Sequence, residues 1–387
     1  MRTFGKWLGR ALLALVLAAV VIGLWKREQI MRLMAVNSLF AEERIVGNFS
    51  NMDAAFLTTP VSRGDGPVAE LQRTENVALP DGAEDWIARR QVTSLLAAKD
   101  GIIRHEAYFL GTDDMDRRIS WSVAKSYLSA LFGVLHANGT IPDLDAPVTD
   151  YVPALAGGAY DGATIRNVLQ MSSGITFDED YLDYDSDINR MGRVLALGGA
   201  MDGFASELTE TFQPAGAAFK YTSIDTHVLA MVVRAAAGRP LAELLSEHIV
   251  SKLGLERDGL YITDGEGVAF ALGGLNFTTR DYARFGMMIE QDGLWQGRQI
   301  VPADWIAEST EASARTEPGK IGYGYQWWIP IGAAENEFLG RGIYGQYLYI
   351  DQDRDVVIVM TAADRKFREE GVEAENTAMF RAIARQL

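Results

Sequence analysis

Short apolar runs of strand length begin near residue 90 of the chain. Residues 91–99 and 102–111 are two such runs, and the Asp100-Gly101 pair between them has the composition of a tight turn. This arrangement predicts an antiparallel hairpin. Later strand signals share the same apolar and aromatic composition and lie at 323–330, 344–351 and 355–362.

The middle of the chain is patterned for helices. Residues 122–136 place apolar side chains at helical spacing and end near Asn138-Gly139, which favours a helix stop. Helical spacing also predicts helices at 164–171, 223–237, 240–253, 278–290, 302–310 and 372–387. Because strands at both ends flank a helical middle, we predict an α/β fold of the α+β type. It has one antiparallel sheet built from both chain ends, flanking helices and an inserted, mostly helical subdomain.

The same pattern divides the chain into segments. Residues 1–30 are an N-terminal membrane anchor or signal segment, and residues 31–87, with turn signals at 64–67 and 80–82, are predicted to be an extended lead-in. The main domain is expected at 88–387, with a sheet subdomain from 88–130 and 265–387 and a helical insertion at 131–264.

The N-terminal segment is predicted to enter a membrane. An apolar run from Ala11 to Trp25 lies between basic residues, and its length falls between a signal-peptide core and a full span. No small-x-small cleavage site precedes Lys26-Arg27, which favours an uncleaved anchor. The basic residues ahead of the run favour a cytoplasmic N-terminus, so the main domain is expected outside the inner membrane, in the periplasm, whether anchored or released.

Composition narrows the chemistry. The chain has no cysteine and four histidines, which excludes a Cys nucleophile and Cys-ligated metals and makes a His-rich site improbable, so we expect no metal and no cofactor. Its formal net charge of −16 over 387 residues disfavours nucleic acid as a partner. The composition does not determine the oligomeric state.

Ser122 and Lys125 are the candidate reactive pair. Spaced three residues apart at the start of a predicted helix, they share one face, beside the free N–H groups of the first turn. A desolvated lysine amine loses its proton readily and then accepts one from a serine hydroxyl. The alternative is a Ser cap followed by an exposed lysine, a common arrangement at helix starts.

Several stretches together resemble the serine β-lactamase-related (class C-like) hydrolases, and within them the 6-aminohexanoate-dimer (nylon-oligomer) hydrolases and class C-like esterases. These stretches are Ser122–Lys125, 164–181, 219–241, 273–286 and 342–351. The resemblance runs from about residue 88 to the end. It implies a β-lactamase/penicillin-binding-protein-like fold and hydrolysis of amides or esters through an acyl-serine, without metal.

The resemblance also implies roles for single residues. Ser122 resembles the nucleophile and Lys125 the lysine that activates it. Tyr221 resembles the tyrosine of a Tyr-x-Asn motif that relays a proton to the leaving group, although Ser223 stands where the Asn would be. Tyr181 resembles the mobile tyrosine that closes over substrate in the nylon-oligomer hydrolases. The alternatives are a packed aromatic for Tyr221 and an exposed loop aromatic for Tyr181.

The third motif departs from the penicillin-recognising pattern. Ile343-Tyr344-Gly345 stands where those enzymes carry Lys-Thr-Gly or His-x-Gly, so no cation remains at that position for a β-lactam carboxylate. Gly345 would let the backbone approach the substrate, and the N–H groups of Gln346 and Ser122 would resemble the oxyanion hole. The same stretch matches G-x-G-x-x-G at 340–345, but it precedes a strand instead of opening a helix, which excludes a dinucleotide site.

These observations predict a membrane-anchored serine hydrolase that acts on small amides or esters, with no nucleic-acid partner. A β-lactamase or D-alanyl-D-alanine carboxypeptidase-like cell-wall enzyme is the alternative within the same lineage. A non-catalytic binding protein on the same fold is the alternative from another class.

Overall fold

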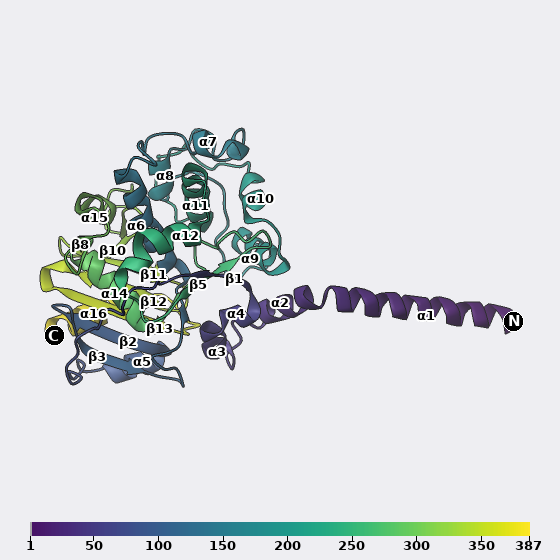
Figure 1. Cartoon of the computed structure of the whole chain (residues 1–387), viewed down its shortest axis with the longest axis horizontal. Helices are drawn as coiled ribbons and strands as arrows, with labels where there is room; N and C mark the ends of the chain where they lie inside the picture. The colour runs from purple at the N-terminus through teal and green to yellow at the C-terminus, as the bar shows by residue number, and fades with distance from the viewer. Residues whose placement is uncertain (1) are drawn as a thin grey trace.

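The computed structural model describes residues 2–387. A long helix, α1 (Arg2–Trp25), projects from the rounded body of the protein and is followed by α2 (Arg27–Asn37), which reaches that body (Figure 1). Residues Lys6–Trp25 of α1 have a mean hydropathy of 2.3 and no contact that buries them. By length and composition this helix is able to cross a membrane.

The main sheet is antiparallel and draws its strands from two distant parts of the chain. Its order is β3-β2-β13-β12-β11-β10-β9. The strands are β2 (Val92–Lys99), β3 (Ile102–Tyr108), β9 (Gly322–Tyr323), β10 (Trp328–Ile329), β11 (Glu337–Gly342), β12 (Gln346–Asp351) and β13 (Val356–Ala362). The predicted hairpin is β2–β3, and β2 pairs with β13 from near the C-terminus. The expected fold class, with a sheet built from both chain ends, is confirmed.

Both faces of this sheet are covered by a packed core, and successive side chains of a strand alternate between the two cores. On β13, Val357 and Val359 join the core beneath α14 (Thr279–Glu290) and α6 (Ala124–Ala137), whereas Ile358 and Met360 face the opposite core. Helices α5 (Ala83–Arg89) and α16 (Val372–Gln386) close that second core, where the Trp86 indole donates to Asn376 at 2.8 Å.

The helical part between β4 and β5 forms the second half of the body (Figure 1). Its helices after α6 are α7 (Val148–Tyr151), α8 (Ile165–Leu169), α9 (Asp187–Leu197), α10 (Met201–Ser206), α11 (Ser223–Ala237), α12 (Leu241–Leu245) and α13 (Ser251–Leu253). The helix predicted at 240–253 is interrupted by a π-helical turn at Ser246–Val250. After this part, α15 (Ala303–Thr310) and a small hairpin, β7 (Leu294–Trp295) and β8 (Arg298–Gln299), precede β9.

The structure of residues 31–87 differs from the extended lead-in that the sequence predicted. In place of an extended lead-in, these residues form the end of α2, α3 (Ile45–Ser50), α4 (Met52–Ala55), β1 (Leu57–Val61) and most of α5, and 62–82 is the longest stretch without a helix or strand. β1 is an edge strand of a smaller sheet, in the order β1-β5-β6-β4, with β4 (Arg118–Ile119), β5 (Gly259–Thr263) and β6 (Leu275–Phe277). The physical reason is tertiary: Ile45, Phe49 and Met52 are buried against the body and hold these short elements in place.

Candidate active site

Ser122 lies between strand β4 and helix α6, in a 3₁₀ turn, η1 (Trp121–Val123). The residue before it, Trp121, has a φ of +42°, a left-handed conformation that is strained for a bulky side chain. Such strain persists only where the surroundings enforce it. Here Phe40 and Phe49 of the N-terminal segment pack on the Trp121 ring, with centroids 5.8 and 5.6 Å away.

Lys125 is buried below Ser122. Its Nζ donates to the carbonyl oxygen of Leu272 at 2.8 Å and reaches the Ser223 hydroxyl at 3.5 Å. Burial lowers the pKa of Lys125 to about 7, although the nearby Glu179 and Asp225 carboxyls oppose the shift. Lys125 is buried, so the alternative of an exposed helix lysine is excluded.

Tyr221 precedes helix α11 and stacks on Trp328, with ring centroids 5.0 Å apart. Its ring also lies 5.5 Å from the Lys125 ammonium nitrogen. Burial raises the pKa of Tyr221, and the nearby Ser122 side chain lowers it in part. Tyr221 is thus a packed aromatic that contacts Lys125 and lines the same cavity as Ser122.

Glu179 is a site residue that the sequence analysis missed. Its carboxylate accepts hydrogen bonds from the Ser223 backbone N–H, from the Ser223 hydroxyl at 3.3 Å and from the Tyr181 hydroxyl at 2.9 Å. Burial raises the pKa of Glu179, and these donors together with Lys125 oppose the rise. In the sequence, Glu179 lies two residues before Tyr181, but it is one of several acidic residues in that loop and nothing in the pattern distinguishes it from the others.

The strand beside Ser122 is β11, and its end corrects the expected third motif. A Cβ added to Gly342, the last residue of β11, would lie 3.0 Å from the Ser122 backbone nitrogen, so the two backbones are in close contact. Ile343, Tyr344 and Gly345 form the turn to β12 instead of continuing the strand. Tyr344 and Gly345 have φ values of +59° and +87° there.

Gln346 is not placed for the oxyanion role that we expected. It pairs with Gly342 in the sheet, its side chain bonds to Ala362, and it lines neither cavity next to Ser122. The N–H of Ile343 is better placed, because it directly follows Gly342. Within residues 2–387 it donates no hydrogen bond.

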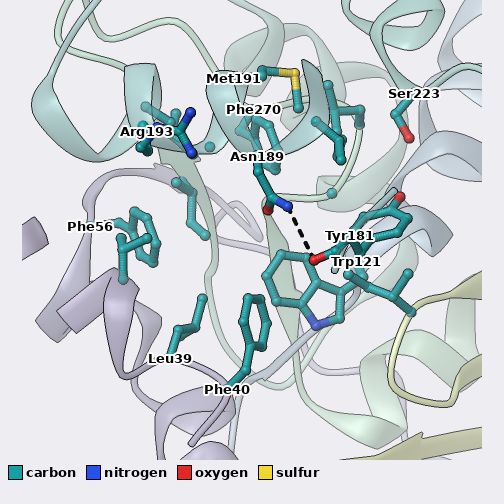
Figure 2. A pocket seen from close by; sticks show the side chains of 18 of the residues that line it. Leu39, Phe40, Phe56, Trp121, Tyr181, Asn189, Met191, Arg193, Ser223 and Phe270 are labelled. Carbon is teal, nitrogen blue, oxygen red and sulfur yellow. Dashed lines mark hydrogen bonds between the residues drawn. The ribbon is translucent and has the colours of Figure 1, made fainter. Parts of the chain in front are cut away.

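An apolar cavity of about 310 Å³ opens on one side of Ser122. We call it the apolar lobe. Figure 2 shows Leu39, Phe40 and Phe56 on one side of it and Met191 and Phe270 on the other, with Trp121, Tyr181 and Ser223 at one end. The side-chain amide of Asn189 donates to the Tyr181 carbonyl oxygen at 3.1 Å and holds the loop that borders this end (Figure 2).

A second cavity of about 490 Å³ lies on the other side of Ser122. We call it the polar lobe. Its walls include Tyr221 and charged residues, which are Glu179, Glu369, Glu370, Glu373, Arg341 and Arg368. Both lobes are lined by Ser122, Tyr181 and Ile343, so they meet at the candidate nucleophile.

Arg341 supplies the cation that the third motif lacked in sequence. Its guanidinium lies 4.0 Å from the centroid of the Trp328 ring and forms an ion pair with Glu373. The charge is therefore already balanced by a carboxylate within the polar lobe.

Sequence comparisons show which family of hydrolases the chain resembles. A sequence model of the β-lactamase family matches residues 120–380. The chain is also 32% identical over 329 residues to a 6-aminohexanoate-dimer hydrolase from Paenarthrobacter ureafaciens, an alignment that covers 80% of this chain and 83% of that protein. The chain belongs to the β-lactamase family, and it is a serine hydrolase.

Solved structures share the fold. One from Bacillus anthracis, provisionally named a 6-aminohexanoate-dimer hydrolase, is 24% identical with a TM-score of 0.80 and covers 89% of this chain and 95% of its own. A penicillin-binding protein from Bacillus halodurans is 16% identical with a TM-score of 0.59 and covers 77% of this chain and 99% of its own. The β-lactamase/penicillin-binding-protein-like fold is thereby confirmed.

Proposed function

We propose that the chain hydrolyses neutral amides or esters through an acyl intermediate on Ser122. The observation that carries the proposal is the buried Lys125 amine, which lies next to the Ser223 hydroxyl and the Tyr221 ring and has its pKa lowered to about 7 by desolvation. A neutral amine accepts the proton of the serine hydroxyl as its oxygen attacks the carbonyl carbon. A non-catalytic binding protein has no use for an amine kept partly neutral.

The negative charge that forms on the carbonyl oxygen needs donors already in place. The Ser122 N–H, in the first turn before α6, and the Ile343 N–H after Gly342 are our candidates for this oxyanion hole. The contact between Gly342 and the Ser122 backbone supports this pairing, because it keeps the two N–H groups next to the same carbonyl position.

Tyr221 is our candidate for protonating the leaving group. Tyr221 and Ser122 both line the polar lobe, and Tyr221 does not line the apolar lobe. When the C–N or C–O bond of the substrate breaks, the proton taken from Ser122 returns through Tyr221 to the departing nitrogen or oxygen. A water molecule then attacks the acyl carbon and gives a proton to Lys125. The bond between the acyl carbon and the Ser122 oxygen breaks, the proton passes from Lys125 to that oxygen, and the carboxylic acid leaves.

The polar lobe favours neutral or cationic leaving groups. Its carboxylates outnumber its guanidinium groups, and Arg341 is paired with Glu373. A β-lactam carboxylate would enter this lobe without a free charged partner and lose its hydration. This arrangement supports amide or ester hydrolysis over β-lactamase or carboxypeptidase activity.

We further propose that α1 anchors the chain in the inner membrane, with the main domain in the periplasm. The apolar helix Lys6–Trp25 supports membrane insertion, and Trp25 and Lys26 at its end are residue types that favour the membrane interface. Protease accessibility in spheroplasts tests the side of the membrane, because a periplasmic domain is digested without lysis.

The experiment for the central proposal is covalent labelling with a fluorophosphonate, read by intact mass and peptide mapping. The wild-type chain should carry one adduct on Ser122, and Ser122→Ala should carry none. Ser129→Ala is the matched control, since Ser129 is buried on the same helix α6 and lines neither lobe. Labelling that persists in Ser122→Ala would overturn the assignment.

A further inference from the structure

We infer that the apolar lobe binds the acyl chain of the substrate, so that the substrate is an ester or amide with an extended apolar acyl group. The inference rests on the proposed function and adds the substrate class. It also assigns a task to residues 36–56, which precede the stretch matched by the family model.

The position of Tyr221 decides which half of the substrate enters which lobe. A group that protonates the leaving atom must lie on the leaving-group side of the reacting carbonyl. Tyr221 lines the polar lobe, so the leaving group occupies that lobe. The acyl half then points to the other side of Ser122, into the apolar lobe.

The composition of the apolar lobe fits a hydrocarbon chain. The N-terminal segment contributes one wall through Val36, Leu39, Phe40, Met52 and Phe56. Helix α9 contributes the facing wall (Figure 2). Enclosure of a methylene group by such walls stabilises binding by about fourfold in affinity, the equivalent of about 0.8 kcal/mol.

The mouth of this lobe is itself apolar. Leu182 and Tyr184 line the lobe and yet are 87% and 67% exposed, so they lie at its opening. On α2, Met31 and Met34 are also exposed. Exposed apolar side chains next to an apolar cavity favour a substrate that is itself partitioned into a lipid surface.

The lobe also lies close to the expected membrane surface. Helix α2 starts directly after Lys26, and its eleven residues span about 17 Å at 1.5 Å per residue. The wall that begins at Val36 therefore lies within about 17 Å of the end of the apolar helix α1. An acyl chain at the bilayer surface has only this distance to cover before reaching the lobe.

The test measures how kcat/KM depends on acyl length, with the leaving group held constant. The full chain in phosphatidylcholine vesicles is assayed with p-nitrophenyl acetate, butyrate and octanoate. Gly192→Phe on α9 is designed to fill the lobe, because Gly192 lines it and a Cβ there meets no atom within 4 Å. Gly203→Phe is the matched control, on the exposed side of α10 and outside both lobes.

We expect kcat/KM to be at least about tenfold higher for octanoate than for butyrate in the wild type and in Gly203→Phe. Gly192→Phe should lower that ratio by about tenfold. Partition of the octanoate ester into vesicles affects the wild type and both variants equally. A fall in the octanoate preference that occurs only in Gly192→Phe is therefore caused by the change in the apolar lobe.

Four outcomes would contradict the inference or the proposed function on which it rests. Acetate turnover with no preference for octanoate, or a preference that Gly192→Phe leaves unchanged, overturns the acyl-lobe inference and leaves the hydrolase intact. If acetate esters of long alcohols are preferred and Gly192→Phe lowers that preference, the apolar lobe binds the leaving group instead of the acyl chain. This result also overturns the inference. Absence of turnover and of any Ser122 adduct with every ester contradicts the proposed function itself.

Discussion

The two lobes that meet at Ser122 are built from different parts of the chain. The polar lobe is lined by residues between 122 and 373, all within the family-matched stretch, and it has more charged side chains than the apolar lobe. The apolar lobe takes one wall from residues 36–56, outside that stretch. Proton transfer and acyl recognition therefore depend on separate segments, which allows one to change without the other.

The two parts are nevertheless joined, because Phe40 and Phe49 both pack on Trp121 and Tyr344. Phe40 lines the apolar lobe, stacks on Tyr344 with ring centroids 4.7 Å apart, and also packs on Trp121. Both partners flank the oxyanion candidates, since Trp121 precedes Ser122 and Tyr344 follows Ile343. The N-terminal segment thus supports the nucleophile turn as well as the acyl wall, and Phe40 is unsuitable as a probe of either role alone.

The largest expected effect tests the proton-transfer side. Lys125→Met should reduce the acylation rate about a thousandfold, because it removes the proposed general base while leaving a side chain of similar length. Burst kinetics with p-nitrophenyl acetate measure this rate, and circular dichroism checks the fold. Lys252→Met on α13 is the control. An acylation rate close to that of the wild type would show that another group deprotonates Ser122.

The pH profile should sharpen the same assignment. Burial lowers the pKa of Lys125 to about 7, and only its neutral form accepts a proton, so kcat/KM should fall about tenfold per pH unit below 7. Glu179→Gln should move this limb to lower pH, because the Glu179 carboxylate raises the pKa of Lys125. Asp178→Asn, an exposed neighbour, is the control. If the acidic side of the pH profile did not move in Glu179→Gln, Glu179 would not influence the group whose pKa sets that profile.

A smaller effect is expected from the charge balance of the polar lobe. Glu373→Gln releases Arg341 from its ion pair, and a partly exposed pair is worth about 1 kcal/mol, or about fivefold. The kcat/KM for a carboxylate-bearing cephalosporin, relative to a neutral ester, should rise by that factor. Glu375→Gln is the control, since Glu375 pairs with Arg89 and Arg90. Efficient cephalosporin hydrolysis by the wild type would contradict our account of this lobe.

The smallest effect should come from Tyr181, one of the three residues that line both lobes. Tyr181→Phe removes one hydrogen bond to Glu179 and keeps the ring, so kcat/KM should fall only about threefold. Tyr151→Phe, on α7 and outside both lobes, is the control. A loss of a hundredfold or more would show that the Tyr181 hydroxyl takes part in the reaction and does more than position Glu179.

Local pattern alone was enough for much of the architecture. The helix predicted at 223–237 is α11 (Ser223–Ala237), and the hairpin around Asp100 is β2–β3. The Ser122–Lys125 spacing on one helix face was likewise visible in the sequence. These features depend on residues close together in the chain, where periodicity and turn composition act directly.

The tertiary structure decided the properties that depend on distant neighbours. The lowered pKa of Lys125 comes from desolvation by the whole surrounding core, and Glu179 reaches the site only because its loop folds over Ser223. The replacement of Gln346 by Ile343 as oxyanion candidate depends on where β11 ends against the Ser122 turn. Residues 31–56 form helices and an acyl wall because their apolar side chains find burial sites on the body. Burial and long-range contact are not encoded in any local window, so these features required the folded chain.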